Sequence, residues 1–233
     1  MLDAILWDYD GTIADTPVKN LAVTKAVLFR LDPALLDPVP QALRSLAAYR
    51  EANYRWNNWR ELYVHAYGVP AGRLDEAGTL WGPCQLADET LPPLFDGLPE
   101  ALERLEPIPM GICSQNDPDN IRAALARHGV GQRFAAVVGH ADVPFDCQRP
   151  HPAAFLACLD RLDLREGRFA YIGDHAADVA FGRRAQAALE TLGRRASVYC
   201  VTAAWGGGRE TADTGADAVV RTPAELADLL LRL

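Results

Sequence analysis

Two aspartates stand two residues apart in the segment Asp8-Tyr9-Asp10-Gly11-Thr12, directly after an apolar run. If the run is a strand, side chains two positions apart point to the same face, so Asp8 and Asp10 lie together. Two neighbouring carboxylates repel each other unless a cation lies between them, and a hard dication such as Mg²⁺ prefers oxygen ligands. The pair therefore indicates a magnesium site, although an ordinary acidic turn remains the alternative for this segment alone.

A second polar group, Ser114, Gln115 and Asn116, follows the apolar run at residues 109–113. An aspartate and a proline typical of a helix start come next. A hydroxyl and free N–H groups at the start of a helix form an anion site. Gly11 permits a tight turn, so the N–H groups around Gly11 and Thr12 are expected to face the same anion.

A basic residue and two more aspartates occur later in the chain. Arg149 stands just before a predicted helix, and Asp174 follows the run at residues 169–172. If a helix begins after Asp174, Asp178 lies on the same face of it four residues on. Taken singly, each has a simpler explanation: a solvated surface arginine, and acidic residues favoured by the dipole at a helix start.

The elements that must position these residues alternate along the chain. Strands are predicted at residues 4–7, 109–113, 134–138, 169–172, 197–201 and 216–220. Helices are predicted at residues 98–105, 118–128, 152–162, 178–192 and 224–233. This alternation predicts an α/β protein with a doubly wound, Rossmann-like, mainly parallel sheet. Because such sheets bind ligands at the carboxyl ends of their strands, the polar groups are expected to meet at one edge.

One long segment breaks the alternation. Residues 17–91 contain no convincing strand, whereas residues 18–30, 41–56 and 59–67 have helical patterns. We therefore expect a catalytic core of residues 1–16 and 92–233 and an α-helical cap domain of residues 17–91 inserted after the first strand. An insert that leaves from the carboxyl edge of the sheet is expected to cover the site.

Composition excludes several classes of protein. The 233 residues are 49% apolar and carry a net charge of −8, which fits a globular chain without a basic stripe for nucleic acid. No run approaches the roughly 18 apolar residues of a membrane span, and the first residues lack a basic leader. The five cysteines are scattered and are expected to be reduced. We expect a cytoplasmic protein with a small-molecule partner; the oligomeric state is left open.

The order of these motifs, DxDGT, a strand ending in serine, a basic residue before a helix and GDxxxD, resembles the haloacid dehalogenase-like superfamily. It most closely resembles the phosphoglycolate phosphatase-like branch with an α-helical cap, and the resemblance covers nearly the whole chain. It includes residues 96–102, 205–206, 215–220 and 223–226. The resemblance implies a Mg²⁺-dependent phosphatase that hydrolyses a small phosphorylated metabolite through an aspartyl phosphate.

The resemblance also implies a role for each motif residue. Asp8 is the implied nucleophile, and Asp10 is the implied general acid and then base. Ser114 holds the phosphoryl oxygens together with the N–H groups of the 8–12 turn. Asp8, the backbone carbonyl of Asp10 and Asp174 bind Mg²⁺, while Asp178 orients the groups around the metal.

Arg149 departs from the family pattern, which usually has lysine there. Arginine also neutralises Asp8 and a phosphoryl group, but as a planar fork rather than a point charge. Arginine at this place resembles phosphonoacetaldehyde hydrolases, which cleave a C–P bond. Those enzymes have alanine where this chain has Asp10, and they need a cap lysine, for which only Lys19 and Lys25 are available.

Three alternatives to a phosphatase remain open. They are a phosphosugar mutase, a phosphonoacetaldehyde hydrolase-like enzyme and a catalytically weak binding protein on the same fold. Dehalogenation fits less well, because Asp10 serves phosphoryl transfer and not dehalogenation. The aromatic side chains at residues 54–63 are expected to form the core of the insert, with the arginines among them solvated. The alternative is an aromatic wall with a cation for a second acidic group on the substrate.

Overall fold

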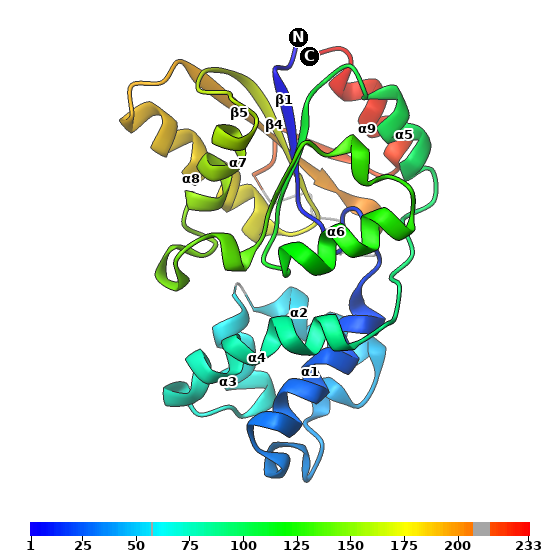
Figure 1. Ribbon diagram of the computed structural model, residues 1–233, viewed down its shortest axis with the longest axis vertical. Helices are drawn as coiled ribbons and strands as arrows, with labels where there is room; N and C mark the ends of the chain where they lie inside the picture. Colours follow the sequence, from blue (N-terminus) through cyan, green and yellow to red (C-terminus); the bar gives the residue numbers. More distant parts are fainter. Residues whose placement is uncertain (57, 207–214) are drawn as a thin grey trace. The chain divides into compact units, whose positions relative to one another are not determined.

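The computed structural model describes residues 1–56, 58–206 and 215–233 (Figure 1). The chain forms two compact units. One consists of Met1–Asp15 with Pro93–Leu233 and is called the core unit below; the other, Thr16–Pro92, is called the helical insert. Among the described residues, no helix is both long and apolar enough to cross a membrane.

The described part of the core unit contains one six-stranded sheet in the order β3-β2-β1-β4-β5-β6. The strands are β1 Ala4–Trp7, β2 Met110–Cys113, β3 Ala136–Val138, β4 Gly167–Gly173, β5 Ala196–Ala203 and β6 Ala218–Val220. Every strand pair is parallel. This confirms the predicted doubly wound α/β fold. The strand order reverses at β1, so the ligand crevice of such a sheet is expected beside the carboxyl end of β1.

Helices cover both faces of the sheet, which explains why its central strands are apolar without alternation. The helices of the core unit are α5 Leu98–Arg104, α6 Pro118–Arg127, α7 Ala153–Arg161, α8 Ala176–Thr191 and α9 Pro223–Leu230. Helices α7 and α8 lie on one side of the sheet, and α5 and α9 lie together on the other (Figure 1). Where α7 and α8 pack on the sheet, a buried cluster is formed by the rings of Phe155 from α7, Phe181 from α8, and Phe169 and Tyr171 from β4.

The helical insert contains α1 Pro17–Leu31, α2 Leu46–Arg55, α3 Trp59–Tyr67 and α4 Leu74–Ala87, and no strand occurs among its described residues. Its own buried cluster includes Leu28, Leu43 and Tyr67. Tyr63 belongs to that cluster, and Trp56 and Trp59 pack against it, so these aromatic residues form part of the core of the insert.

The structure corrects two expectations for the helical insert. The single helix expected over residues 41–56 is instead a 3₁₀ turn, Gln41–Leu43, followed by α2, because the Ser45 side chain accepts the Ala48 N–H and caps a new helix. Helix α4 was not expected, because Gly78, Gly82 and Pro83 lie inside it and such residues normally disfavour helices. Tertiary packing overrides that local preference.

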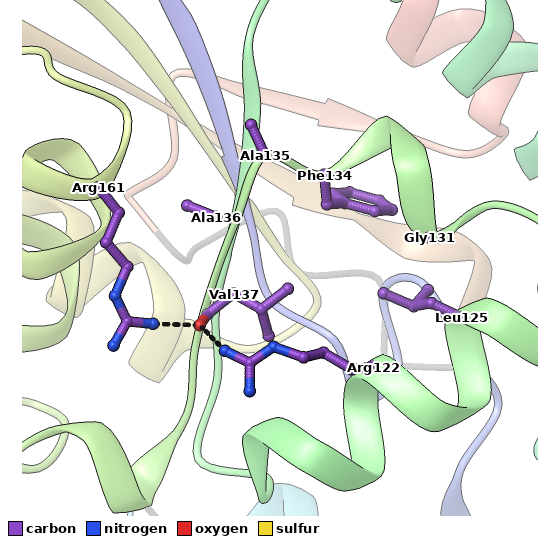
Figure 2. Close-up of a pocket in the computed structure, with 8 residues that line it drawn as sticks. All are labelled: Arg122, Leu125, Gly131, Phe134, Ala135, Ala136, Val137 and Arg161. Atoms are coloured by element: carbon purple, nitrogen blue, oxygen red, sulfur yellow. Dashed lines mark hydrogen bonds between the residues drawn. The ribbon is translucent and has the colours of Figure 1, made fainter.

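The open edge of the sheet at β3 is covered by side chains rather than by another strand. A cavity of about 450 Å³ lies there, lined by Arg122, Leu125, Gly131, Phe134, Ala135, Ala136, Val137 and Arg161 (Figure 2). The carbonyl of Val137 accepts hydrogen bonds from Arg122, at 3.1 Å, and from Arg161. Both arginines also pair with aspartates, Asp119 and Asp142. The paired charges protect a strand edge that would otherwise be open to another chain.

Gly139 allows the end of β3 to approach the turn that follows β2. A Cβ at residue 139 would lie 2.5 Å from the backbone oxygen of Asn116 and 2.7 Å from the backbone nitrogen of Pro118. We expect Gly139→Ala to lower the free energy of unfolding by about 1–3 kcal/mol, because the backbone must move to make room. Urea denaturation measures this change. Gly72→Ala is the control, since a Cβ there meets nothing within 4 Å, and equal losses in both variants would contradict the prediction.

Candidate active site

The turn after β1 brings Asp8 and Asp10 to the carboxyl edge of the sheet. Asp8 continues the strand pairing, because its N–H donates to the carbonyl of Ile172 at 2.8 Å. The turn is closed by the Gly11 N–H, which donates to the carbonyl of Ala14 at 2.9 Å. Gly11 has a φ of +76°, and a Cβ there would overlap the carboxylate of Asp174. Only glycine therefore allows this turn to approach Asp174 so closely.

Three carboxylates converge at this edge. Asp8, Asp174 and Asp178 each present an oxygen, and these oxygens all lie within 4.8 Å of one another. Asp174 follows β4, and Asp178 belongs to the first turn of α8. Asp178 is fixed there because it accepts the N–H of His175 at 3.0 Å, which caps the helix. Carboxylate oxygens at this spacing suit a hard dication such as Mg²⁺.

The site concentrates negative charge in a buried place. Asp8 is only 4% exposed. Burial raises the pKa of the Asp8 carboxyl well above its ordinary value, Arg149 opposes this rise, and the charges of Asp178, Asp10 and Asp174 add to it. A cation bound here in addition to Arg149 would relieve the repulsion among the carboxylates.

Arg149 supplies the positive charge within the cluster. Its Nη2 donates to Asp8 Oδ1 at 2.9 Å, and its Nη1 donates to Asp178. The side chain is 14% exposed, so the guanidinium lies inside the site and not on the surface. Burial alone would lower the pKa of Arg149, but Asp8, Tyr171 and Asp178 raise it, and the net change is upward. The guanidinium therefore stays charged at neutral pH.

Asp10 lies in a different environment from Asp8. Both of its carboxylate oxygens accept hydrogen bonds from Asn116 Nδ2, at 3.1 and 3.0 Å, and one lies 3.5 Å from the Ser114 hydroxyl. The Asn116 amide is itself fixed, because its oxygen accepts a hydrogen bond from Asn120 at 2.8 Å. The turn after β2 therefore holds Asp10 in one orientation.

The structure brings the residues predicted from sequence to one edge of the sheet, but the cluster of three carboxylates there contains Asp178 and not the side chain of Asp10. The Asn116 side chain bonds to Asp10, and the Gln115 side chain donates to the carbonyl of Arg149 at 3.0 Å. The carbonyl of Thr12 accepts the indole N–H of Trp205 at 3.0 Å, which ties the β1 turn to the end of β5.

Two residues of this site were not found by sequence reasoning. Tyr171 and Phe181 contact Arg149, and Tyr171 does so through its hydroxyl. The sequence offers one signal for Tyr171, which is that its hydroxyl interrupts the otherwise apolar run at residues 169–172.

The chain is similar to known hydrolases in sequence and in fold. A family model described as haloacid dehalogenase-like hydrolase matches residues 2–186. A phosphoglycolate phosphatase from Chromobacterium violaceum is 28% identical over 236 residues, which cover 91% of this chain and 98% of that protein. Another from Xanthomonas campestris pv. campestris is 27% identical over 234 residues, covering 96% and 94% of the two chains. A haloacid dehalogenase-like family hydrolase from Streptococcus pneumoniae has the same fold, with a TM-score of 0.71, 16% identity and 98% of each chain covered.

The raised pKa of Asp8 predicts how the stability of the metal-free protein depends on pH. The folded protein keeps a proton on Asp8 at pH values where the unfolded chain has lost it, so this group destabilises the folded state as the pH rises above about 4. Asn cannot ionise, so the melting temperature of Asp8→Asn minus that of the wild type should increase from about pH 4 to about pH 8 in EDTA. Thermal melts over that range measure it, with exposed Asp75→Asn as the control. A difference that does not change with pH would refute the prediction.

Proposed function

This chain belongs to the haloacid dehalogenase-like hydrolases, as its motifs indicated, and on that premise we propose that it is a phosphatase. Its proposed reaction is the Mg²⁺-dependent hydrolysis of a small phosphate monoester through an aspartyl phosphate on Asp8. The observation that carries the proposal is the position of Asp8. Its carboxylate lies at the carboxyl edge of the sheet, paired with Arg149 and beside two further carboxylates. An oxygen nucleophile next to a fixed cation is what attack on phosphorus requires.

In the proposed first step, an Asp8 oxygen attacks phosphorus while the bond from phosphorus to the ester oxygen breaks. Arg149 lowers the repulsion between the Asp8 carboxylate and the incoming phosphate, since its Nη2 already contacts Asp8. Asp10, in protonated form, gives its proton to the departing alkoxide. The products of this step are the free alcohol and a phosphorylated Asp8.

In the proposed second step, Asp10 takes a proton from a water molecule, and the resulting hydroxide attacks the phosphorus of the aspartyl phosphate. The bond from phosphorus to the Asp8 oxygen breaks, which releases inorganic phosphate and restores the carboxylate. Asn116 serves both steps, because it holds both Asp10 oxygens within 3.1 Å and so fixes the direction of the proton transfer.

The residues at the edge of the sheet fit a Mg²⁺ ion. The donors are hard carboxylate oxygens within 4.8 Å of one another, and their mutual repulsion adds to the high pKa of Asp8. We assign the ion to Asp8, Asp174 and the backbone carbonyl of Asp10, with Asp178 beside them. When bound, Mg²⁺ would neutralise charge on the transferring phosphoryl group.

The substrate is proposed from the relatives and from the chemistry of the site. Both relatives named above are called phosphoglycolate phosphatase, so phosphoglycolate is the first candidate among small phosphate monoesters. We propose that the helical insert, which begins directly after the β1 turn, acts as the cap that selects the substrate.

The proposed function predicts release of inorganic phosphate that depends on both Mg²⁺ and Asp8. Purified protein with Mg²⁺ should hydrolyse phosphoglycolate or another ester from a panel of small phosphate esters, and excess EDTA should abolish the release. Asp8→Asn should reduce turnover to the background level, because the amide is neither a nucleophile nor an anionic ligand. A phosphate-release assay measures both effects. Isomerised sugar phosphate without free phosphate would instead identify a mutase, and full activity in EDTA would refute the metal requirement.

The contact between Arg149 and Asp8 allows an estimate of how much the charge of the arginine contributes to turnover. Two unit charges about 4 Å apart at an effective dielectric near 20 interact by about 4 kcal/mol, so loss of the guanidinium should be costly. We expect Arg149→Ala to lower kcat by at least about a hundredfold, since each 1.36 kcal/mol is a factor of ten. Arg165→Ala removes an exposed arginine and is the control. A rate for Arg149→Ala within a few-fold of the wild type would contradict this role.

A further inference from the structure

The Arg149 guanidinium is held by more groups than its two carboxylate partners. Its Nη1 also donates to the hydroxyl oxygen of Tyr171 at 2.8 Å. The Tyr171 hydroxyl in turn donates to the backbone carbonyl of Cys113, at the end of β2, at 3.2 Å. Tyr171 is 1% exposed and lies in the middle of β4, so its hydroxyl has a fixed position. Arg149 is thereby connected to the backbone of the sheet through one uncharged side chain.

An aromatic ring completes the surroundings of the guanidinium. The Arg149 Cζ lies 5.4 Å from the centroid of the Phe181 ring, within the range of a cation–π contact. The Phe181 ring packs edge to face against Tyr171, with centroids 5.1 Å apart. Gln115 fixes the other end of the residue through the backbone carbonyl of Arg149. We call Tyr171 and Phe181 the arginine socket.

The arginine socket matches a planar fork and not a single charged nitrogen. Nη1 faces Tyr171 and Asp178, while Nη2 faces Asp8, so the two sides of the guanidinium are used at once. A lysine ammonium has one nitrogen on a flexible stem and cannot occupy both places. The residue type at position 149 is therefore matched by the groups around it.

We propose that Tyr171 is a positioning residue, which holds the fork of Arg149 so that Nη2 faces Asp8. The Tyr171 hydroxyl is neutral, so it can fix Arg149 without adding another negative charge to the carboxylate cluster. Asp178, which accepts the other Nη1 hydrogen bond, is also one of the three carboxylates that could hold a metal ion. The hydrogen bond from Nη1 to Tyr171 can therefore persist when a cation binds the carboxylate of Asp178. This inference rests on the proposed phosphatase function of the same site.

A double-mutant cycle tests the inference. Tyr171→Phe keeps the ring and removes the hydroxyl, and we expect kcat to fall about tenfold, equal to about 1.4 kcal/mol, with KM changed less than about twofold. In the Arg149→Ala background the same change should cost no further activity, because Tyr171 acts only through the guanidinium. Tyr199→Phe is the matched control and should leave kcat unchanged, since the Tyr199 hydroxyl bonds to the carbonyl of Asp217 away from this site.

Two kinetic outcomes would overturn the inference. An equal loss of kcat in the wild-type and Arg149→Ala backgrounds would show that Tyr171 supports the fold and not the arginine. No loss in the wild-type background would show that the hydroxyl does not position Arg149.

An NMR measurement without substrate separates this inference from the proposed function. The guanidinium N–H signals of Arg149, assigned by their loss in Arg149→Ala, should be resolved in the wild type and broadened in Tyr171→Phe. If Tyr171→Phe leaves these signals unchanged, Tyr171 does not position the guanidinium and the inference is wrong. If they broaden as expected in a protein that releases no phosphate from any ester, the proposed function fails and the socket stands.

Discussion

Crowding of negative charge at one end of the sheet is the constraint on which this structure depends. Asp8, Asp174 and Asp178 place oxygens within 4.8 Å of one another, and burial removes the water that would otherwise screen them. Such an arrangement persists only with compensating cations and fixed donors. Arg149 provides one fixed cation in contact with two of the three carboxylates. The remaining repulsion is what makes the edge a good place for a metal ion and for a reaction that moves an anionic group.

The fold supplies the rigidity that this crowding demands. Strands β1 and β4 are neighbours in register, so Asp8 and Asp174 leave the sheet side by side. Gly11 lets the β1 turn pass against the Asp174 carboxylate, and the helix-capping contact of Asp178 fixes the third oxygen. Each carboxylate is thus attached to a different backbone element within one packed core. Because a parallel sheet packs on both faces, none of these elements can move away to relieve the repulsion.

The sequence predicted the parts of the site that depend on local order and missed those that depend on packing. The spacing of Asp8 and Asp10 after an apolar run, and of Asp174 and Asp178 across a helix start, is visible in one segment at a time. The sheet followed from the alternation of strands and helices. By contrast, Tyr171 reaches Arg149 across 22 positions, and Asn116 reaches Asp10 across 106, so no local pattern marks these pairs. Helix α4 was missed for a related reason: its stability comes from neighbouring helices, against the preference of its own glycines and proline.

The arginine at position 149 shows how one departure from a family pattern is accommodated in a core. A guanidinium is wider than an ammonium and needs partners for two nitrogens, so an arginine placed in a lysine site would leave one side unsatisfied. Here the second side finds a neutral hydroxyl on β4, a carboxylate on α8 and the face of an aromatic ring. These groups come from elements that already meet at the edge of the sheet. The residue type at position 149 therefore depends on the residues at positions 171 and 181, because their contacts determine where the guanidinium lies relative to Asp8.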